Sequence, residues 1–184
     1  MKTLKIILIV CISVIAVCTG IYAYFGGFKN IEFETLEQGG EILAYEEVIG
    51  DYSQTAEVTN RVYNYLLDEH DIETFKGFGI FYDNPETTDR DRMRSESGCI
   101  IQNADSSKLA DISGKVKIKR AAKGNYIVTE FPYKGAMSIM VGIMKVYPAM
   151  AKYAIENGIK DENPIMEIYD VPSKKIIYRR QFDR

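Results

Sequence analysis

The stretch Gly79-Ile80-Phe81-Tyr82-Asp83-Asn84-Pro85 is echoed by Glu167-Ile168-Tyr169-Asp170-Val171-Pro172. Both stretches contain Tyr-Asp-x-Pro after apolar residues, and their tyrosines, at positions 82 and 169, lie 87 residues apart. A glycine opens an amphipathic segment before each stretch, at Gly50 and at Gly135. Helix and strand signals that recur at nearly the same spacing, 85 residues for the glycines and 87 for the tyrosines, indicate a duplicated unit. We therefore expect residues 50–85 to superpose on residues 135–172, with Tyr82 and Tyr169 in equivalent places.

Around this repeat, the alternation of apolar and polar residues predicts two βαββ units. Strands are expected at 31–36, 42–49, 79–82, 94–102, 116–119, 126–131, 165–169 and 175–182, and helices at 51–69 and 137–156. Pro148 lies inside the second helix, where its missing N–H should kink the helix or split it. The order predicts an α+β fold, with duplicated βαββ units, a mainly antiparallel sheet, two helices on one face and a groove between the halves. Such a groove is a common site for small ligands.

Residues 1–28 are expected to form a transmembrane anchor or a signal-like segment, followed by one domain at 31–184. Ile6 to Phe25 carries no charge and is long enough to cross a bilayer. Lys2 and Lys5 precede it and several glutamates follow it, which predicts a single-pass membrane protein with an extracytoplasmic domain. Cleavage as a signal peptide, or lipidation at Cys18, is the alternative interpretation.

The composition argues against several classes of protein. A net charge of −3 with mixed signs gives no general attraction for nucleic acid. His70 is the single histidine, so the sequence offers neither a histidine-rich metal site nor a Ser-His-Asp triad. No nucleotide-binding fingerprint is present, and we expect no metal and no cofactor.

The order of these motifs resembles the GyrI-like small-molecule-binding family, which also forms the effector-binding domain of AraC-type and MerR-type regulators. The resemblance covers residues 31–184 and rests on these motifs: Gly50-x-Tyr52, Gly79 to Pro85, Met93-Arg94-x-Glu96-x-Gly98, Gly124-x-Tyr126, Gly135, Asn157-Gly158 and Pro164 to Tyr169. It implies a groove in which a glutamate, here Glu167, attracts cationic aromatic ligands. No helix-turn-helix motif precedes the domain, so we do not expect a complete transcription regulator.

Glu167 is the central candidate for ligand contact. Strand alternation puts it on the same face as Ile165 and Tyr169, and a buried carboxylate is costly without a partner. A ligand cation could be that partner, and the alternative is a lysine or arginine of a neighbouring strand. The other expected ligand-binding residues could supply aromatic walls or pliable apolar contacts: Tyr169, Tyr82, Tyr147, Tyr126, Met140 and Met144.

These residues favour a non-enzymatic module, held at the membrane, that captures amphipathic cationic or aromatic small molecules in a groove centred on Glu167. The alternative is a hydrolase of strained electrophilic rings in which the same glutamate assists attack by water, as the resemblance to some relatives implies. A third hypothesis is a protein-interaction module that the anchor brings to a partner at the membrane.

Overall fold

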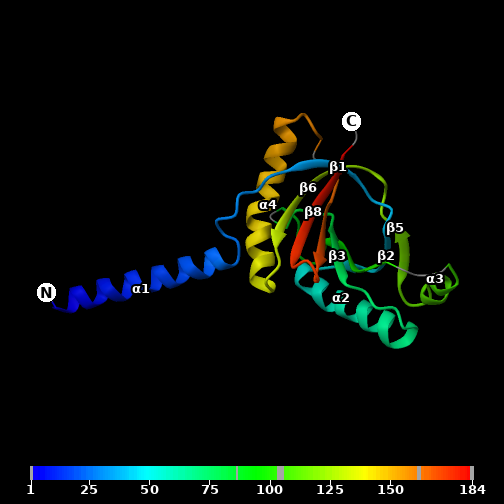
Figure 1. Ribbon diagram of the computed structural model, residues 1–184, viewed down its shortest axis with the longest axis horizontal. Coiled ribbons are helices and arrows are strands. Elements are labelled where there is room, and N and C mark those ends of the chain that lie inside the picture. The colour runs from blue at the N-terminus through cyan, green and yellow to red at the C-terminus, as the bar shows by residue number, and fades with distance from the viewer. Residues whose placement is uncertain (1, 86, 103–105, 161–162, 183–184) are drawn as a thin grey trace.

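The computed structural model describes all residues except 1, 86, 103–105, 161–162 and 183–184 (Figure 1). Its elements in chain order are α1 (Lys2–Tyr24), β1 (Glu34–Gln38), β2 (Ile42–Ile49), η1 (Tyr52–Gln54), α2 (Thr55–Asn64), η2 (Tyr65–Glu69), β3 (Lys76–Phe81), β4 (Arg94–Ile101), α3 (Ser106–Ile112), β5 (Lys117–Arg120), β6 (Gly124–Pro132), α4 (Ala136–Glu156), β7 (Ile165–Asp170) and β8 (Lys175–Phe182). The predicted α+β class is confirmed, and the short helix α3 was not expected.

The strand order shows the duplication. The sheet runs β1-β6-β8-β7-β3-β4-β2-β5, and the strand pairs are antiparallel. The βαββ unit of β2, α2, β3 and β4 therefore mirrors the unit of β6, α4, β7 and β8 about the central β3–β7 pair. The two remaining strands cross over, because β1 extends the second unit and β5 extends the first.

Two crossing links, residues 39–41 between β1 and β2 and residues 121–123 between β5 and β6, draw the two edges of the sheet together. The backbone N–H of Gly40 donates to Ala121 O (2.8 Å), and Ala121 N–H donates to Glu41 O (2.9 Å). Gly39 has a positive φ of 103°, and a Cβ there would lie 1.9 Å from Ala122 O, so a glycine is needed at this contact. The sheet is therefore curled, with one concave face.

Helices α2 and α4 cover the other face (Figure 1). Beneath α2 lies a cluster that includes Val62, Leu66 and Cys99, and beneath α4 lies one that includes Phe131 and Val146. A third apolar cluster lines the concave face: Leu43, Tyr45, Phe78, Ile80, Ile100, Ala121, Met166 and Ile168. Both faces of the central strands are thus buried, which positions β3 and β7 rigidly between two apolar layers.

The two repeat helices differ in detail from the prediction. Asp51 caps the start of η1 by accepting a hydrogen bond from Ser53 N–H (2.8 Å), and α2 then ends in the π-helical turn η2. Pro148 does not split α4, which continues from Ala136 to Glu156. The first half of α4 packs on the sheet through Ser138, Val141 and Gly142, and this tertiary packing stabilises a helix with a proline inside it.

The predicted equivalence of Tyr82 and Tyr169 is wrong by one position. Glu167 lies opposite Gly79 in the β3–β7 pair, so Gly79 and Phe81 face the helices with Glu167 and Tyr169. Ile80 lies opposite Glu96, and Tyr82 shares their concave face. An offset of one residue turns every side chain of a strand to the other face. If Phe81 is matched to Tyr169 instead, at a spacing of 88 residues, both side chains of the matched pair point toward the helices.

Helix α1 extends away from the domain (Figure 1). It is long and apolar enough to cross a membrane, with a mean hydropathy of 2.7 over its most apolar window, and that window is not buried against the rest of the chain. A signal sequence near the N-terminus has the same length and composition, so the helix fits either interpretation of residues 1–28.

Candidate functional site: a buried glutamate beneath α4

Glu167 lies in the centre of the sheet with no solvent exposure. Its β7 segment alternates as the sequence predicts, because Met166 and Ile168 belong to the concave cluster while Ile165 packs beneath α4. Glu167 therefore faces the helices, with Gly79 opposite it on β3 and Tyr178 opposite it on β8. The strand register places a carboxyl group in the buried layer between the sheet and the helices.

Two tyrosines donate hydrogen bonds to this carboxyl group. Tyr147 Oη, on α4, lies 2.8 Å from Glu167 Oε1, and Tyr169 Oη, on β7, lies 2.7 Å from Oε2. Among the described residues, no lysine or arginine forms a salt bridge with Glu167. The alternative interpretation, an ion pair between Glu167 and a lysine or arginine of a neighbouring strand, is therefore not found among the described residues.

Burial governs the protonation of the site. It raises the pKa of Glu167 to about 7, and the two tyrosine hydrogen bonds oppose this rise. Burial and the nearby carboxylate raise the pKa values of Tyr147 and Tyr169 well above their ordinary range, so both remain hydroxyl donors. The site therefore changes between a neutral and a negative form close to neutral pH.

Glycines on β3 form the floor beside Glu167. A Cβ at Gly77 would lie 3.1 Å from Thr59 Cγ2 on α2 and 3.7 Å from the Tyr169 ring, so Gly77 marks the seam between the two halves. A Cβ at Gly79 would lie 2.8 Å from the Phe81 ring. The Phe81 ring thus occupies the space above Gly79, next to the position of Glu167.

The space around the carboxyl group is filled by the chain's own aromatic rings. Phe81 contacts the ring of Tyr52 (4.8 Å between centroids), and Tyr133 contacts that of Tyr169 (5.9 Å). Tyr178 contacts Tyr147 (6.2 Å), and its buried hydroxyl has no hydrogen-bond partner within the described residues. The structure shows a closed site whose walls are aromatic.

The structure brings three of the seven predicted residues together: Glu167, Tyr147 and Tyr169. Tyr82 and Tyr126 lie on the concave face, where Tyr126 packs under the Arg179 guanidinium (5.0 Å). Met140 and Met144 point away from the sheet and are 59% and 74% exposed. Periodicity identified the methionine stripe, but it could not tell which side of α4 meets the sheet.

Sequence reasoning missed Phe81, Tyr133 and Tyr178. The signal for Tyr178 was present, because a hairpin with its turn at 171–174 sets Tyr178 opposite Glu167. Phe81 was missed because the repeat was aligned one residue out of phase. Tyr133 follows the end of β6, where strand alternation no longer predicts direction.

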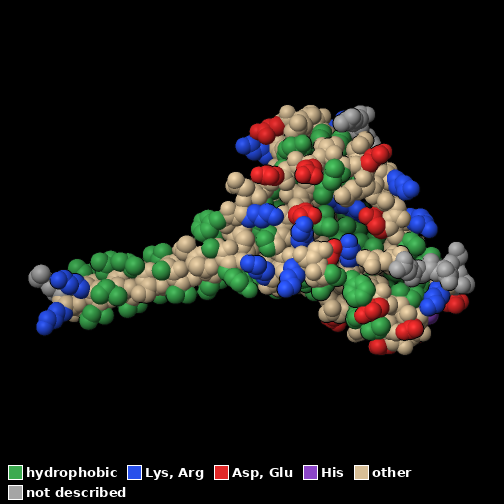
Figure 2. Space-filling view, viewed as in Figure 1, with side chains coloured by type: hydrophobic (Ala, Val, Ile, Leu, Met, Phe, Trp, Pro, Cys, Tyr) green, Lys and Arg blue, Asp and Glu red, His purple; other side chains and the backbone are tan. Residues whose placement is uncertain are grey.

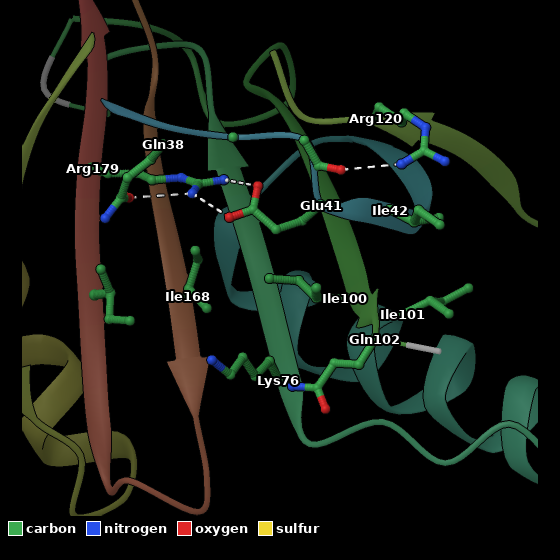
Figure 3. Close-up of a pocket in the computed structure, with 13 residues that line it drawn as sticks. Gln38, Glu41, Ile42, Lys76, Ile100, Ile101, Gln102, Arg120, Ile168 and Arg179 are labelled. Carbon is green, nitrogen blue, oxygen red and sulfur yellow. Dashed lines mark hydrogen bonds and ion pairs between the residues drawn. The ribbon is translucent and has the colours of Figure 1, made fainter. Parts of the chain in front are cut away.

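A separate cavity of about 570 Å³ opens on the concave face (Figure 3). Its charged groups are paired with other groups of the chain. Arg179 binds Glu41 (2.7 Å), Lys76 binds Asp170 (2.9 Å), and Arg120 donates to Gly40 O (3.3 Å). The contacts of Arg179 and Arg120 join the sheet to residues 40 and 41 of the link between β1 and β2, and Lys76–Asp170 joins β3 to β7, so the fold explains their role.

Searches of family models and of curated proteins find no match. Solved structures do match in shape. The C-terminal domain of EcmrR is 12% identical, with 84% of this chain and 98% of that chain covered and a TM-score of 0.60. SAV2435 bound to tetraphenylphosphonium is 11% identical, with coverage of 83% and 94% and a TM-score of 0.58.

A third structure, a hydrolase encoded by lin2189 from Listeria innocua, is 13% identical, with coverage of 88% and 98% and a TM-score of 0.54. At these identities the likeness concerns the fold alone. The GyrI-like fold expected from the sequence is supported by these neighbours.

Proposed function

We propose that this protein is a membrane-anchored binding module that captures hydrophobic aromatic cations between α2 and α4. The observation that carries the proposal is the Glu167 carboxyl group, which is fully buried and has no cationic partner among the described residues. A buried negative charge without a cationic partner is costly, and a bound cation would offset that cost.

The surrounding rings suit such a ligand. Tyr147, Tyr169 and Tyr178 present aromatic surface around the carboxyl group, and ring faces attract cations. SAV2435, which shares the fold, is bound to tetraphenylphosphonium, an aromatic cation. We extend this class of ligand to the present chain because it meets both the charge of Glu167 and the shape of its walls.

Binding requires the site to open, because Glu167 has no exposed surface. Phe81 is the side chain best placed to move. It stands at the end of β3 and is partly exposed, and its ring fills the space above Gly79 rather than completing a hydrogen-bond network. A rotation of this ring toward solvent would leave a space floored by glycine beside the carboxyl group.

The test compares Glu167→Gln with the parent chain in nanodiscs. Equilibrium dialysis would measure tetraphenylphosphonium and the neutral triphenylphosphine oxide against empty nanodiscs. The loss of a charge-assisted contact of about 1.5 to 3 kcal/mol should weaken the cation roughly ten- to hundredfold and leave the neutral ligand unchanged. An equal loss for both ligands, or no binding of the cation by the parent chain, would refute the proposal.

The membrane anchor is part of the proposal and has its own test. Lysines flank the N-terminal side of α1, so the N-terminus should remain in the cytoplasm and the domain should lie outside it. Protease added to intact spheroplasts should then digest the domain. Protection until the membrane is opened would reverse the assigned orientation, and a mature chain lacking residues 1–28 would disprove the anchor.

A second candidate function is hydrolysis of a strained ring. Its supporting observation is the Glu167 pKa of about 7, which suits a general base, beside two tyrosine hydroxyls that can donate. Glu167 would take a proton from water as the water oxygen bonds to a ring carbon and the bond from that carbon to the neighbouring ring atom breaks. A tyrosine would protonate the released ring atom, and Glu167 would then return its proton to the tyrosine oxygen. Turnover of an epoxide or cyclopropane probe, abolished in Glu167→Gln, would favour this function over simple binding.

A further inference from the structure

The outer face of α4 lacks the polar residues that a solvent-exposed helix usually carries. Its exposed residues over 136–148 are all apolar: Ala136, Met137, Met140, Met144 and Pro148. Met137, Met140 and Met144 are 47%, 59% and 74% exposed, while Val141 and Val146 pack on the sheet. A helix that is apolar on both sides is typically buried on both sides.

The matching helix of the other half provides the comparison. The exposed face of α2 carries Glu57, Asn60, Arg61 and Asn64, which is the ordinary pattern for a helix packed on one side. The two helices hold corresponding positions in the duplicated fold, so the fold itself does not require the apolar outer face of α4. That face needs an explanation particular to α4.

The end of α1 is attached next to this face. Lys145, on α4, donates to the carbonyl oxygens of Gly27 (2.5 Å) and Lys29 (2.6 Å). Lys134, just before α4, donates to Tyr24 O (2.8 Å) and lies over the Tyr24 ring (4.2 Å). These contacts hold the first half of α4 against the junction where α1 meets the domain.

The direction of the two helices is also informative. In Figure 1, α4 runs across the direction of α1 on the side of the domain from which α1 departs. A spanning helix lies close to the bilayer normal. If α1 spans the membrane, α4 lies along the membrane surface, beside the point where the chain leaves the bilayer.

We propose that the exposed methionine face of α4, formed by Met137, Met140 and Met144, docks on the surface of the bilayer that α1 crosses. Helices that lie in the interface bury one apolar face at the boundary of headgroups and acyl chains. Exposed Tyr24 and Phe28 at the junction add aromatic side chains, which favour the same depth.

Charge favours an anionic lipid surface as the partner. Figure 2 shows basic side chains on the domain beside the junction with α1, and Lys29, Lys134 and Lys145 lie there by their contacts. An ammonium group has three donors, so each can still meet a lipid phosphate. The docked face carries no acidic residue between 136 and 148 to oppose this attraction.

Docking of α4 would add a route of ligand entry to the proposed function, and this role of the docking rests on that function. Tyr147 lies one turn beyond Met144 on α4 and donates to Glu167. Hydrophobic cations that gather at the bilayer surface would then reach the Glu167 site from the membrane side.

The chain contains no tryptophan, so a single introduced tryptophan gives an unambiguous signal. The test places Met144→Trp and, as the matched control, Ile49→Trp in full-length protein reconstituted into vesicles of phosphatidylcholine and phosphatidylglycerol, with and without brominated acyl chains. Ile49 is 73% exposed, close to the 74% of Met144, but it lies at the end of β2. Met144→Trp should lose about half or more of its emission to brominated lipid, and Ile49→Trp should lose almost none.

Two other outcomes of the quenching experiment decide against the docking. Equal and weak quenching of both variants would show that α4 is in water. Protection of Met144→Trp from acrylamide without quenching by brominated lipid would show that a second protein copy covers the face. Dialysis of tetraphenylphosphonium with the Ile49→Trp protein tests the binding function separately. Cation binding without lipid quenching of Met144→Trp would refute the docking alone. Quenching of Met144→Trp without cation binding would refute the proposed function alone.

Discussion

Lowering the pH from 8 to 6 should weaken the binding of tetraphenylphosphonium about tenfold if the ligand pairs with ionised Glu167. The magnitude follows from the raised pKa of about 7. With that value, roughly nine-tenths of the carboxyl groups are ionised at pH 8 and roughly one-tenth at pH 6. The cation gains its charge-assisted contact only with the ionised fraction, so the apparent affinity should follow that fraction.

Isothermal titration calorimetry of the full chain in nanodiscs would measure this dependence. Titrations at pH 7 in two buffers with different ionisation enthalpies should also show release of about half a proton for each cation bound, because binding drives the remaining protonated Glu167 to ionise. Glu167→Gln is the control, since it keeps the shape of the side chain and cannot ionise. Its weaker affinity should not vary over this pH range.

A constant affinity of the parent chain from pH 6 to 8, or the same pH dependence in Glu167→Gln, would refute the pairing of the cation with ionised Glu167. In the first case the carboxyl group would already be ionised or would not contact the cation. In the second case another group would be titrating.

Three further predictions concern stability and access. Burial raises the pKa of Glu167 above its unfolded value, so the contribution of this group to the free energy of unfolding should be greatest below about pH 4.5 and should fall by about 3 kcal/mol as the pH rises through about 7. Chemical denaturation of Glu167→Gln should lack this pH-dependent component. An identical pH dependence in both proteins would contradict the prediction. Phe81→Ala should strengthen binding of the cation in the same dialysis assay by vacating the space above Gly79, whereas weaker binding would show that the ring is part of the binding wall. Gly142→Ala should destabilise the domain by about 1 to 3 kcal/mol in thermal unfolding, because the added Cβ would lie 2.3 Å from Tyr178 Oη. Combining it with Tyr178→Phe, which removes that hydroxyl, should recover part of the lost stability.

The duplication could be predicted from the sequence because each unit carries its own local signals. Gly50 and Gly135 precede the helices, and apolar alternation marks the strands that follow. The exchange of β1 and β5 between the halves could not be predicted. It depends on hydrogen bonds between two links, at Gly40 and Ala121, that lie far apart in the chain, and pairing across such distances leaves no local pattern.

The candidate site was predicted in its centre and missed at its edges for a related reason. Glu167 and Tyr169 lie two residues apart on one strand, so alternation alone places them on one face. Tyr82 was assigned by matching similar motifs, and a match that is one residue out reverses the face. Met140 and Met144 form a real stripe on α4, but either side of an apolar helix satisfies the same periodicity, and packing on the sheet decides which side is buried.

The two halves of the duplicated fold contribute different chemistry where they meet. Glu167 of one half lies directly opposite Gly79 of the other. Side chains at directly opposed positions have Cβ atoms roughly 5 Å apart, so a second carboxylate in place of Gly79 would repel the first, and a large apolar side chain would fill the space beside it. Glycine avoids both and leaves that space to the ring of Phe81. The asymmetry between a carboxyl group on β7 and a bare backbone on β3 is therefore what allows a symmetric fold to hold one charge and, as we propose, one cationic ligand at its axis.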